Sequence, residues 1–336
     1  MTVSIADVAQ RAGVSRTTVS HVLSGNRPVS AAAAERVRSA MAELRYVPSR
    51  AAQSLALGST RTIGLLVPDI SNGFFADLAK GVEATSIENG FNVLLCNTGW
   101  NLEREVFYLE TLRSRAVDGV VYASGSPPAA SKLAELLSGF PAVAVDEALP
   151  GVSVTSVLSK NRQGGRVAAD HLLSLGHRGA AVVGVNTHLA SNAQRLNGFQ
   201  TQWRKATGRR ALVVNGSFDE ESGAHGARAL LTKIRSGEVT AIFATNDLGA
   251  LGVISALRDA GINVPRDCSV VGFDDSLAAR HANPPLTTVR QDAAGMGARA
   301  AEALVAQLSG SAPDPKTALP IQLIVRASTA TAPANQ

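Results

Sequence analysis

The sequence predicts a small all-α domain followed by a larger α/β core of two similar lobes. Three observations support this prediction. The first 46 residues contain three short stretches with helical spacing of apolar residues. From residue 62 onward, short apolar runs alternate with amphipathic stretches. The net charge of +5 is carried entirely by residues 1–61, which hold eight Arg, no Lys and three acidic residues. A basic head on a neutral body is therefore expected.

Two short helices joined by a tight turn are predicted within residues 4–23. Ser4 and Asp7 resemble a capping box at the first helix, with Asp in place of the usual Glu or Gln. Ser15 is a good N-cap for the second. Gly13 lies between them, where a tight turn needs a residue that adopts positive φ. This pattern is typical of a helix-turn-helix, although two ordinary amphipathic helices at a domain edge would share it.

The polar face of the second helix suits a nucleic acid. Arg16, Thr17, Ser20 and His21 can all donate hydrogen bonds and none is acidic, so the face fits the DNA major groove. A third helix is predicted at 31–44, capped by Ser30. Residues 49–58 form a helical pattern that is too short to be stable alone, and we interpret it as a linker that folds when supported.

Composition limits the remaining classes. With 336 residues, 45% of them hydrophobic and 18% charged, the chain is long enough for two or three globular domains. The basic head favours a phosphate backbone over a membrane surface, because no wide apolar face carries Trp or Phe. Cys96 and Cys268 lie in apolar runs and are expected to be buried, reduced thiols of a cytoplasmic chain. We find no secretion signal and no apolar run long enough for a membrane span.

Eight buried strands are expected in the core, in two sets of four. The apolar runs are 63–67, 92–96, 119–123, 142–145, 180–185, 211–214, 241–244 and 269–273. The helical stretches are 74–89, 103–115, 129–139, 161–175, 193–206, 221–236, 247–260 and 292–308. Such alternation predicts two doubly wound parallel sheets, one in each lobe, with a cleft between them.

Ligands of such sheets bind at the carboxyl ends of the strands. The residues that follow the apolar runs are rich in amides, aromatics and carboxylates, and they include one Arg. They are 69–75, 98–101, Asp146, 186–195, Phe218, 246–247 and 274–275. This set suits a small polyhydroxylated ligand, since Arg and Asp can bond adjacent hydroxyls and aromatic rings can cover a sugar's C–H face. Each residue taken singly could equally be a loop cap or an ion-pair partner.

Motifs along most of the chain resemble the LacI/GalR family of bacterial transcription regulators. The matching motifs are IADVA at 5–9, GVS at 13–15, TVS at 18–20, YVPS at 46–49, VPD at 67–69, RLNGF at 195–199, ND at 246–247, SVVGFDD at 269–275 and PLTTV at 285–289. The resemblance implies a periplasmic-binding-protein-like core. It also implies a DNA-binding domain at 1–47, a hinge helix and linker at 48–61, and a core for effector binding and dimerisation at 62–336.

The resemblance also assigns roles. Arg16, Thr17 and His21 would face base edges, and Leu55 of the hinge helix would be a wedge in the minor groove. The full DNA-binding set is Ser15, Arg16, Thr17, Ser20, His21, Arg50, Ala52 and Leu55. In the cleft, the principal effector contacts would be Arg195, Asn246 and Asp274. The supporting residues would be Phe74, Phe75, Trp100, Asp146, Ser191 and Phe218.

Three departures from the family pattern affect this assignment. Gly73 replaces a usual Pro, which predicts a looser loop. Leu189 stands where a purine-responsive member has an Arg, which argues against a purine ligand. The turn at 159–161 lacks a common Asp, so Lys160 receives no role.

The sequence therefore predicts a ligand-responsive repressor that binds a pseudo-palindromic DNA operator as a homodimer. The tail lacks leucine heptads that would form a tetramer. No metal, cofactor or membrane partner is expected. One alternative is the solute-binding protein of a transporter, which the basic head disfavours. Another is an enzyme using Asp247, Asp274 and Asp275, but no phosphate loop, metal-ligand spacing or nucleophile elbow accompanies these carboxylates.

Overall fold

The computed structural model describes residues 3–24, 27–46, 58–149 and 151–333. The N-terminal head consists of α1 (Ile5–Ala12), α2 (Arg16–Ser24) and α3 (Ala31–Glu43). The predicted capping box is confirmed, because Ser4 and Asp7 exchange bonds at the start of α1, and Gly13 has φ 63° in the turn. Val8, Val19 and Val37 are fully buried at the centre of the three helices.

Lobe 1 contains a six-stranded sheet in the order β11-β5-β4-β3-β1-β2, with every neighbouring pair parallel. Its strands are β1 (Thr62–Val67), β2 (Asn92–Asn97), β3 (Gly119–Tyr122), β4 (Ala142–Val145), β5 (Thr155–Ser159) and β11 (Lys316–Leu319). Its helices are α5 (Gly73–Glu88), α6 (Leu102–Thr111) with a π-helical turn η1 (Leu112–Ala116), α7 (Ala130–Leu137) and α13 (Ala293–Leu308). α5 and α13 pack on one face of the sheet, and α6 and α7 pack on the other.

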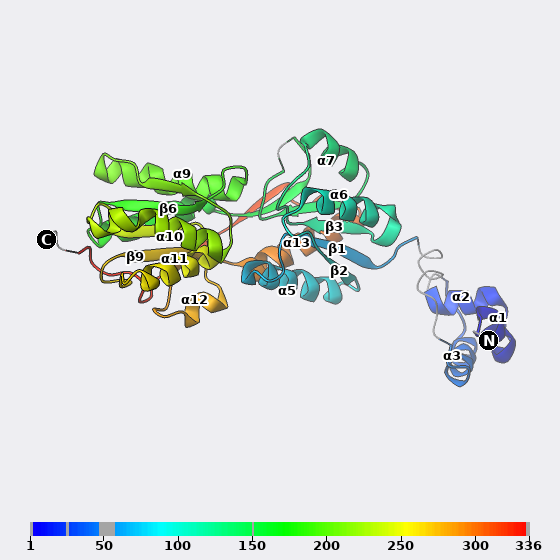
Figure 1. Ribbon diagram of the computed structural model, residues 1–336. Helices are drawn as coiled ribbons and strands as arrows, with labels where there is room; N and C mark the ends of the chain where they lie inside the picture. The colour runs from blue at the N-terminus through cyan, green and yellow to red at the C-terminus, as the bar shows by residue number, and fades with distance from the viewer. Residues whose placement is uncertain (1–2, 25–26, 47–57, 150, 334–336) are drawn as a thin grey trace.

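Lobe 2 contains a sheet in the order β12-β10-β9-β8-β6-β7. Its strands are β6 (Ala180–Val185), β7 (Leu212–Asn215), β8 (Ala241–Ala244), β9 (Ser269–Asp274), β10 (Thr287–Gln291) and β12 (Ile321–Ile324). Its helices are α8 (Asn161–Ser174), α9 (Ala190–Thr207), α10 (Glu220–Arg235), α11 (Asp247–Asp259) and the short α12 (Leu277–His281). α8 and α9 cover one face of the sheet, and α10 and α11 cover the other (Figure 1).

The prediction of eight strands in two parallel sets of four was wrong in number. The described residues form twelve strands, and β12 runs antiparallel to β10. The sequences of β5 and β10, TSVLS and TTVRQ, are too polar to stand out as apolar runs, although tertiary packing buries most of their residues. Pro320 divides the apolar tail into β11 in lobe 1 and β12 in lobe 2.

The chain therefore passes between the lobes three times, after β5, after β10 and after β11. Both sheets direct their carboxyl ends toward the cleft. A strand that continues from lobe 1 into lobe 2 must run against the strands there, which explains the antiparallel β12. The predicted burial of Cys96 and Cys268 is confirmed. None of the helices in the described residues is long and apolar enough to cross a membrane.

Candidate ligand cleft and nucleic-acid interface

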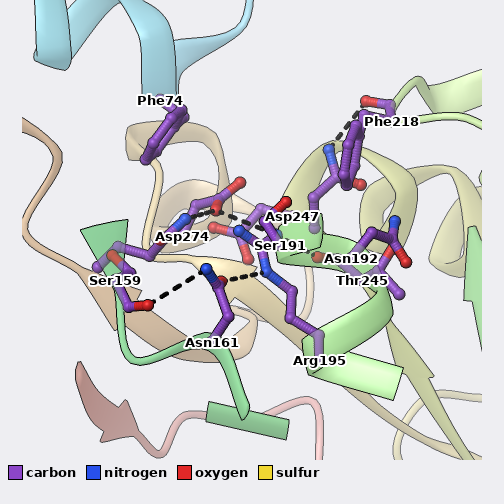
Figure 2. A network of polar contacts seen from close by, with 12 residues as sticks. Phe74, Ser159, Asn161, Ser191, Asn192, Arg195, Phe218, Thr245, Asp247 and Asp274 are labelled. Carbon is purple, nitrogen blue, oxygen red and sulfur yellow. Dashed lines mark hydrogen bonds and ion pairs between the residues drawn. The ribbon is translucent and has the colours of Figure 1, made fainter. Parts of the chain in front are cut away.

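A cavity lies between the lobes at the carboxyl ends of both sheets (Figure 2). Its lining residues are Asn72, Phe74, Phe75, Asp146, Arg195, Phe218, Asn246, Asp274 and Gln291. The volume is about 20 Å³, which is room for roughly one water molecule. A ligand the size of a sugar can therefore occupy this central cavity only if the lobes separate.

Arg195 is held rigidly at the centre of this cavity. It lies on α9 and is 3% exposed. Its Nε donates to Oδ1 of Asn161 at 2.8 Å and its Nη1 donates to the carbonyl oxygen of Thr245 at 2.7 Å. Its guanidinium lies 3.9 Å from the centre of the Phe273 ring, a favourable cation–π distance. The guanidinium is therefore positioned in advance for a ligand.

Asp274 lies beside Arg195 at the end of β9. One carboxylate oxygen is 4.0 Å from Nη1 of Arg195 and accepts a hydrogen bond from Nε2 of Gln291 at 2.7 Å. Burial raises the pKa of Asp274 to about 8, although the charge of Arg195 acts in the opposite direction. Its backbone has φ 125°, a region that L-residues rarely adopt. Such strain is characteristic of a functional position.

Two hydrogen-bond acceptors in the lining lack partners. Oδ1 of Asp146 and Oε1 of Gln291 are buried and accept no hydrogen bond within the part of the chain that the structure describes. Burial also raises the pKa of Asp146, and the charge of Arg195 opposes this. Buried acceptors without partners are costly, so the cavity favours a ligand that brings donors.

Aromatic rings join the two lobes at the edge of the cavity. The Phe75 and Trp100 centroids are 6.1 Å apart in lobe 1, and the ring of Trp100 lies 5.8 Å from that of Phe218 in lobe 2. Phe74 meets Phe75 edge to face at 5.1 Å. This wall can cover the apolar face of a sugar ring.

In the head, α2 exposes the predicted recognition residues. Arg16 and Thr17 are exposed, whereas Ser20 and His21 are half-buried beside the fully buried Val19. Ser15 caps the helix, because its Oγ accepts from the backbone N–H of Thr18 at 3.0 Å. The remaining predicted DNA contacts, Arg50, Ala52 and Leu55, lie outside the described residues.

The end of the linker is fastened to lobe 1 by Asp118. This carboxylate accepts from Oγ of Ser59 at 2.6 Å, from the backbone N–H of Thr60 at 2.6 Å and from that of Arg61 at 2.9 Å. Asp118 directly precedes β3. The last residues of the linker are therefore fixed at the amino end of β3 in the lobe 1 sheet.

Comparison with known proteins decides the family. Residues 4–49 match the model of bacterial regulatory proteins of the lacI family, and residues 169–329 match a periplasmic binding protein-like domain. The HTH-type transcriptional regulator DegA of Bacillus subtilis is 36% identical over 335 residues, which cover 98% of each chain. The chain belongs to the LacI family. The ribose operon repressor of Haemophilus influenzae is 35% identical over 90% of this chain and 91% of its own.

Solved structures of this family share the whole architecture. The lac repressor dimer bound to operator and an anti-inducer superimposes with a TM-score of 0.86 at 27% identity, over 98% of this chain and 100% of that one. The regulator CelR in complex with cellobiose has a TM-score of 0.71 at 34% identity, over 97% and 99%. This LacI-family chain is therefore a ligand-responsive, DNA-binding transcriptional repressor with a helix-turn-helix head and a two-lobed core.

Seven of the nine predicted effector residues line the cavity of this LacI-family core, and two do not. Trp100 lies against Phe75 and Phe218, and Ser191 bonds Glu147. Sequence reasoning included Asn72 only within the stretch 69–75, without a role of its own, and it missed Gln291 in the lining. Asn72 shows a local signal as the N-cap of α5, but Gln291 ends a strand that the apolar pattern did not reveal.

Asn246 and the carboxylates Asp247 and Asp275 have local partners. Asn246 caps α11, accepting from the N–H of Gly249 at 3.0 Å and donating to the carbonyl oxygen of Phe218 at 2.8 Å. Asp247 accepts from the N–H of Ser276 at 2.7 Å, and burial raises its pKa to about 6. Asp275 is bound by a group of arginines. They are Arg280, Arg290 and Arg326.

Proposed function

We propose that the cleft binds a neutral polyhydroxylated ligand and that this binding controls attachment of the head to operator DNA. The observation that carries the proposal is the pair of buried, unpartnered acceptors, Asp146 Oδ1 and Gln291 Oε1, beside a fixed Arg195. Hydroxyl groups can donate to both acceptors and can accept from the guanidinium. Phe74 and Phe218 would cover the ligand's C–H faces.

An anionic ligand fits the same residues poorly. Among the described lining residues Arg195 is the one cation, and it already faces the carboxyl groups of Asp146 and Asp274. A phosphate or carboxylate would have to give up its hydration in a buried site whose one cation already faces two carboxyl groups. Family structures with bound ribose and with cellobiose support a sugar as the ligand class.

For the nucleic-acid partner, we propose a pseudo-palindromic operator bound by a homodimer. Support comes from the exposed donors of α2, the concentration of positive charge in residues 1–61 and the operator-bound dimer of the lac repressor. Arg16, Thr17 and His21 would contact base edges, and Leu55 would enter the minor groove. The domain boundaries at 47 and 61 stay predictions.

Ligand and DNA must then be coupled through the lobes. A change in the angle between the lobes would move the linker, whose end is fixed to Asp118. By thermodynamic linkage, the factor by which the ligand changes operator affinity equals the factor by which the operator changes ligand affinity.

We also infer that the protein acts in the cytoplasm, with its DNA, and that it is not an enzyme. Asp247 and Asp275, two of the carboxylates considered for catalysis, are occupied by the backbone N–H of Ser276 and by arginines respectively. Turnover of a sugar or nucleoside by the pure protein would contradict this inference.

A thermal-shift screen tests the ligand class. The panel would contain D-ribose, cellobiose, hexoses, polyols and nucleosides, with ribose 5-phosphate and gluconate as anionic counterparts. A ligand at 100 times its Kd stabilises the protein by about 2.7 kcal/mol, which raises the melting temperature measurably. Stabilisation by an anion, with none by its neutral counterpart, would refute the neutral class.

Arg195→Ala tests the site itself. The variant should lose the thermal shift and the ligand's effect on operator binding in a gel-shift assay, while it still binds operator. A variant that responds at wild-type ligand concentrations would remove Arg195 from the site.

A further inference from the structure

A buried carboxylate of lobe 1 caps a helix of lobe 2. Glu147 follows β4 in lobe 1, and Ser191 lies in the first turn of α9 in lobe 2. Oε2 of Glu147 accepts from the backbone N–H of Ser191 at 3.1 Å, and Oε1 is bonded to the Ser191 hydroxyl. The residues are 5% and 2% exposed. This contact crosses between the lobes and is fully enclosed.

The helix that receives this cap has none from its own N-cap side chain. Leu189 occupies the N-cap position of α9 and makes no side-chain bond to the first turn. By contrast, Asp219 caps α10 and Asn246 caps α11 within lobe 2. A helix N-terminus favours a negative group or a hydrogen-bond acceptor. Separation of the lobes would remove the acceptor that Glu147 supplies to α9.

The same two elements carry ligand-site residues. Asp146, with its unpartnered oxygen, is the neighbour of Glu147 in lobe 1. Arg195 lies one helical turn beyond Ser191 on α9. The Glu147–Ser191 bond therefore fixes the distance between a carboxylate and a guanidinium that line the cavity from opposite sides (Figure 2 shows Ser191 and Arg195).

We infer that Glu147 is a positioning residue that holds the two lobes closed by capping α9 across the cleft. This inference rests on the proposed function, because closure matters only if the cleft takes a ligand. Glu147 touches Ser191 rather than the cavity and acts on the ligand through Asp146 and Arg195.

Closure can be measured without a ligand through Trp100. Its ring lies 5.8 Å from Phe218 of the other lobe, so separation of the lobes exposes it. The chain's second Trp, Trp203, is 1% exposed within lobe 2 and stays protected from a quencher. Acrylamide quenching of tryptophan fluorescence therefore reports lobe separation.

The variants are Glu147→Ala, Glu147→Gln and Ser191→Ala, with Asp267→Asn as the matched control. Asp267 also accepts a backbone N–H, from Asn263 at 2.7 Å, but within lobe 2 and at the end of β9 away from Asp274. Glu147→Ala should raise the quenching constant about twofold or more, because losing both hydrogen bonds to Ser191 shifts a two-state equilibrium roughly tenfold.

The conservative variants separate capping from general stability. Glu147→Gln keeps an oxygen for the Ser191 N–H and should quench like the wild type. Ser191→Ala keeps that N–H and should show an intermediate constant. Asp267→Asn should leave quenching unchanged.

Two results would overturn the inference. One is wild-type quenching in Glu147→Ala with a native circular dichroism spectrum. The other is an equal rise in Glu147→Ala and Asp267→Asn. Since the readout needs neither ligand nor DNA, a ligand screen without hits would count against the proposed function and leave this test intact.

Discussion

A single methyl group between α8 and α9 should disable the ligand site. Gly165 of α8 packs so closely against α9 that a Cβ there would lie 1.9 Å from the carbonyl oxygen of Arg195. Ordinary contact begins near 3.4 Å, so in Gly165→Ala the two helices must separate by about 1.5 Å. The displaced residue is the one that carries the central guanidinium.

The bonds of Arg195 cannot tolerate a shift of that size. They reach Asn161 at 2.8 Å and the Thr245 carbonyl at 2.7 Å, and a lengthening of about 1.5 Å breaks both. Hydrogen bonds of a charged group such as the Arg195 guanidinium contribute about 1.5–3 kcal/mol. If that free energy is lost from ligand binding, the affinity falls by roughly 10- to 100-fold. Overpacking costs about 1–3 kcal/mol of stability, partly offset by the better helix propensity of Ala.

Gly179→Ala is the control for this experiment. Its Cβ would lie 1.9 Å from the carbonyl oxygen of Glu238, the same clash in the same lobe, but at the amino end of β6 and away from the cleft. Isothermal titration with the ligand found in the screen, together with thermal melts, measures both effects. Both variants should melt a few degrees lower, and only Gly165→Ala should bind the ligand weakly. Equal affinities in the two variants would refute the reasoning.

Three further predictions concern pH, the linker and the hinge. Burial raises the pKa of Glu147 to about 7 and of Asp274 to about 8, so the folded protein binds these protons more tightly than the unfolded chain does. The stability that this proton binding contributes is lost as pH rises through 7 to 8. Melting temperature should therefore fall between about pH 5 and pH 8 and then level off, with a shallower fall in Glu147→Gln, and a flat profile would contradict this. Asp118→Ala removes the acceptor for the linker's last residues and should weaken operator binding in a gel shift while ligand affinity stays unchanged; unchanged operator affinity would exclude a role for that anchor. Leu55→Ala should weaken operator affinity strongly at constant ligand affinity, and equal affinity would rule out the wedge.

Several elements of the fold follow from local chemistry and could be predicted from residues alone. Ser4 with Asp7, and Gly13 after them, determine the start and end of α1 through bonds within a few positions. The charge of the head is a property of composition. Six of the eight strands that the prediction identified are buried apolar runs between covered faces, whereas the edge strands β2 and β7, also expected to be buried, are largely exposed.

The strands that the apolar pattern did not predict could not be identified from local sequence alone. β10 reads TTVRQ, and its burial depends on β9 beside it and on β12, which comes from the far end of the chain. Gln291 at its end was therefore not identified, although it lies in the cavity lining.

The basic head, its first two helices and most of the cavity lining were determined by the sequence itself, because caps, turns and the ends of apolar runs are encoded within short windows. Only the tertiary structure decided that the chain passes three times between the lobes and that Glu147 caps a helix of the opposite lobe. It also decided which acceptors remain without partners. The physical reason is that a buried polar group depends on its neighbours for a hydrogen-bond partner, and in this protein that neighbour often comes from a distant part of the chain.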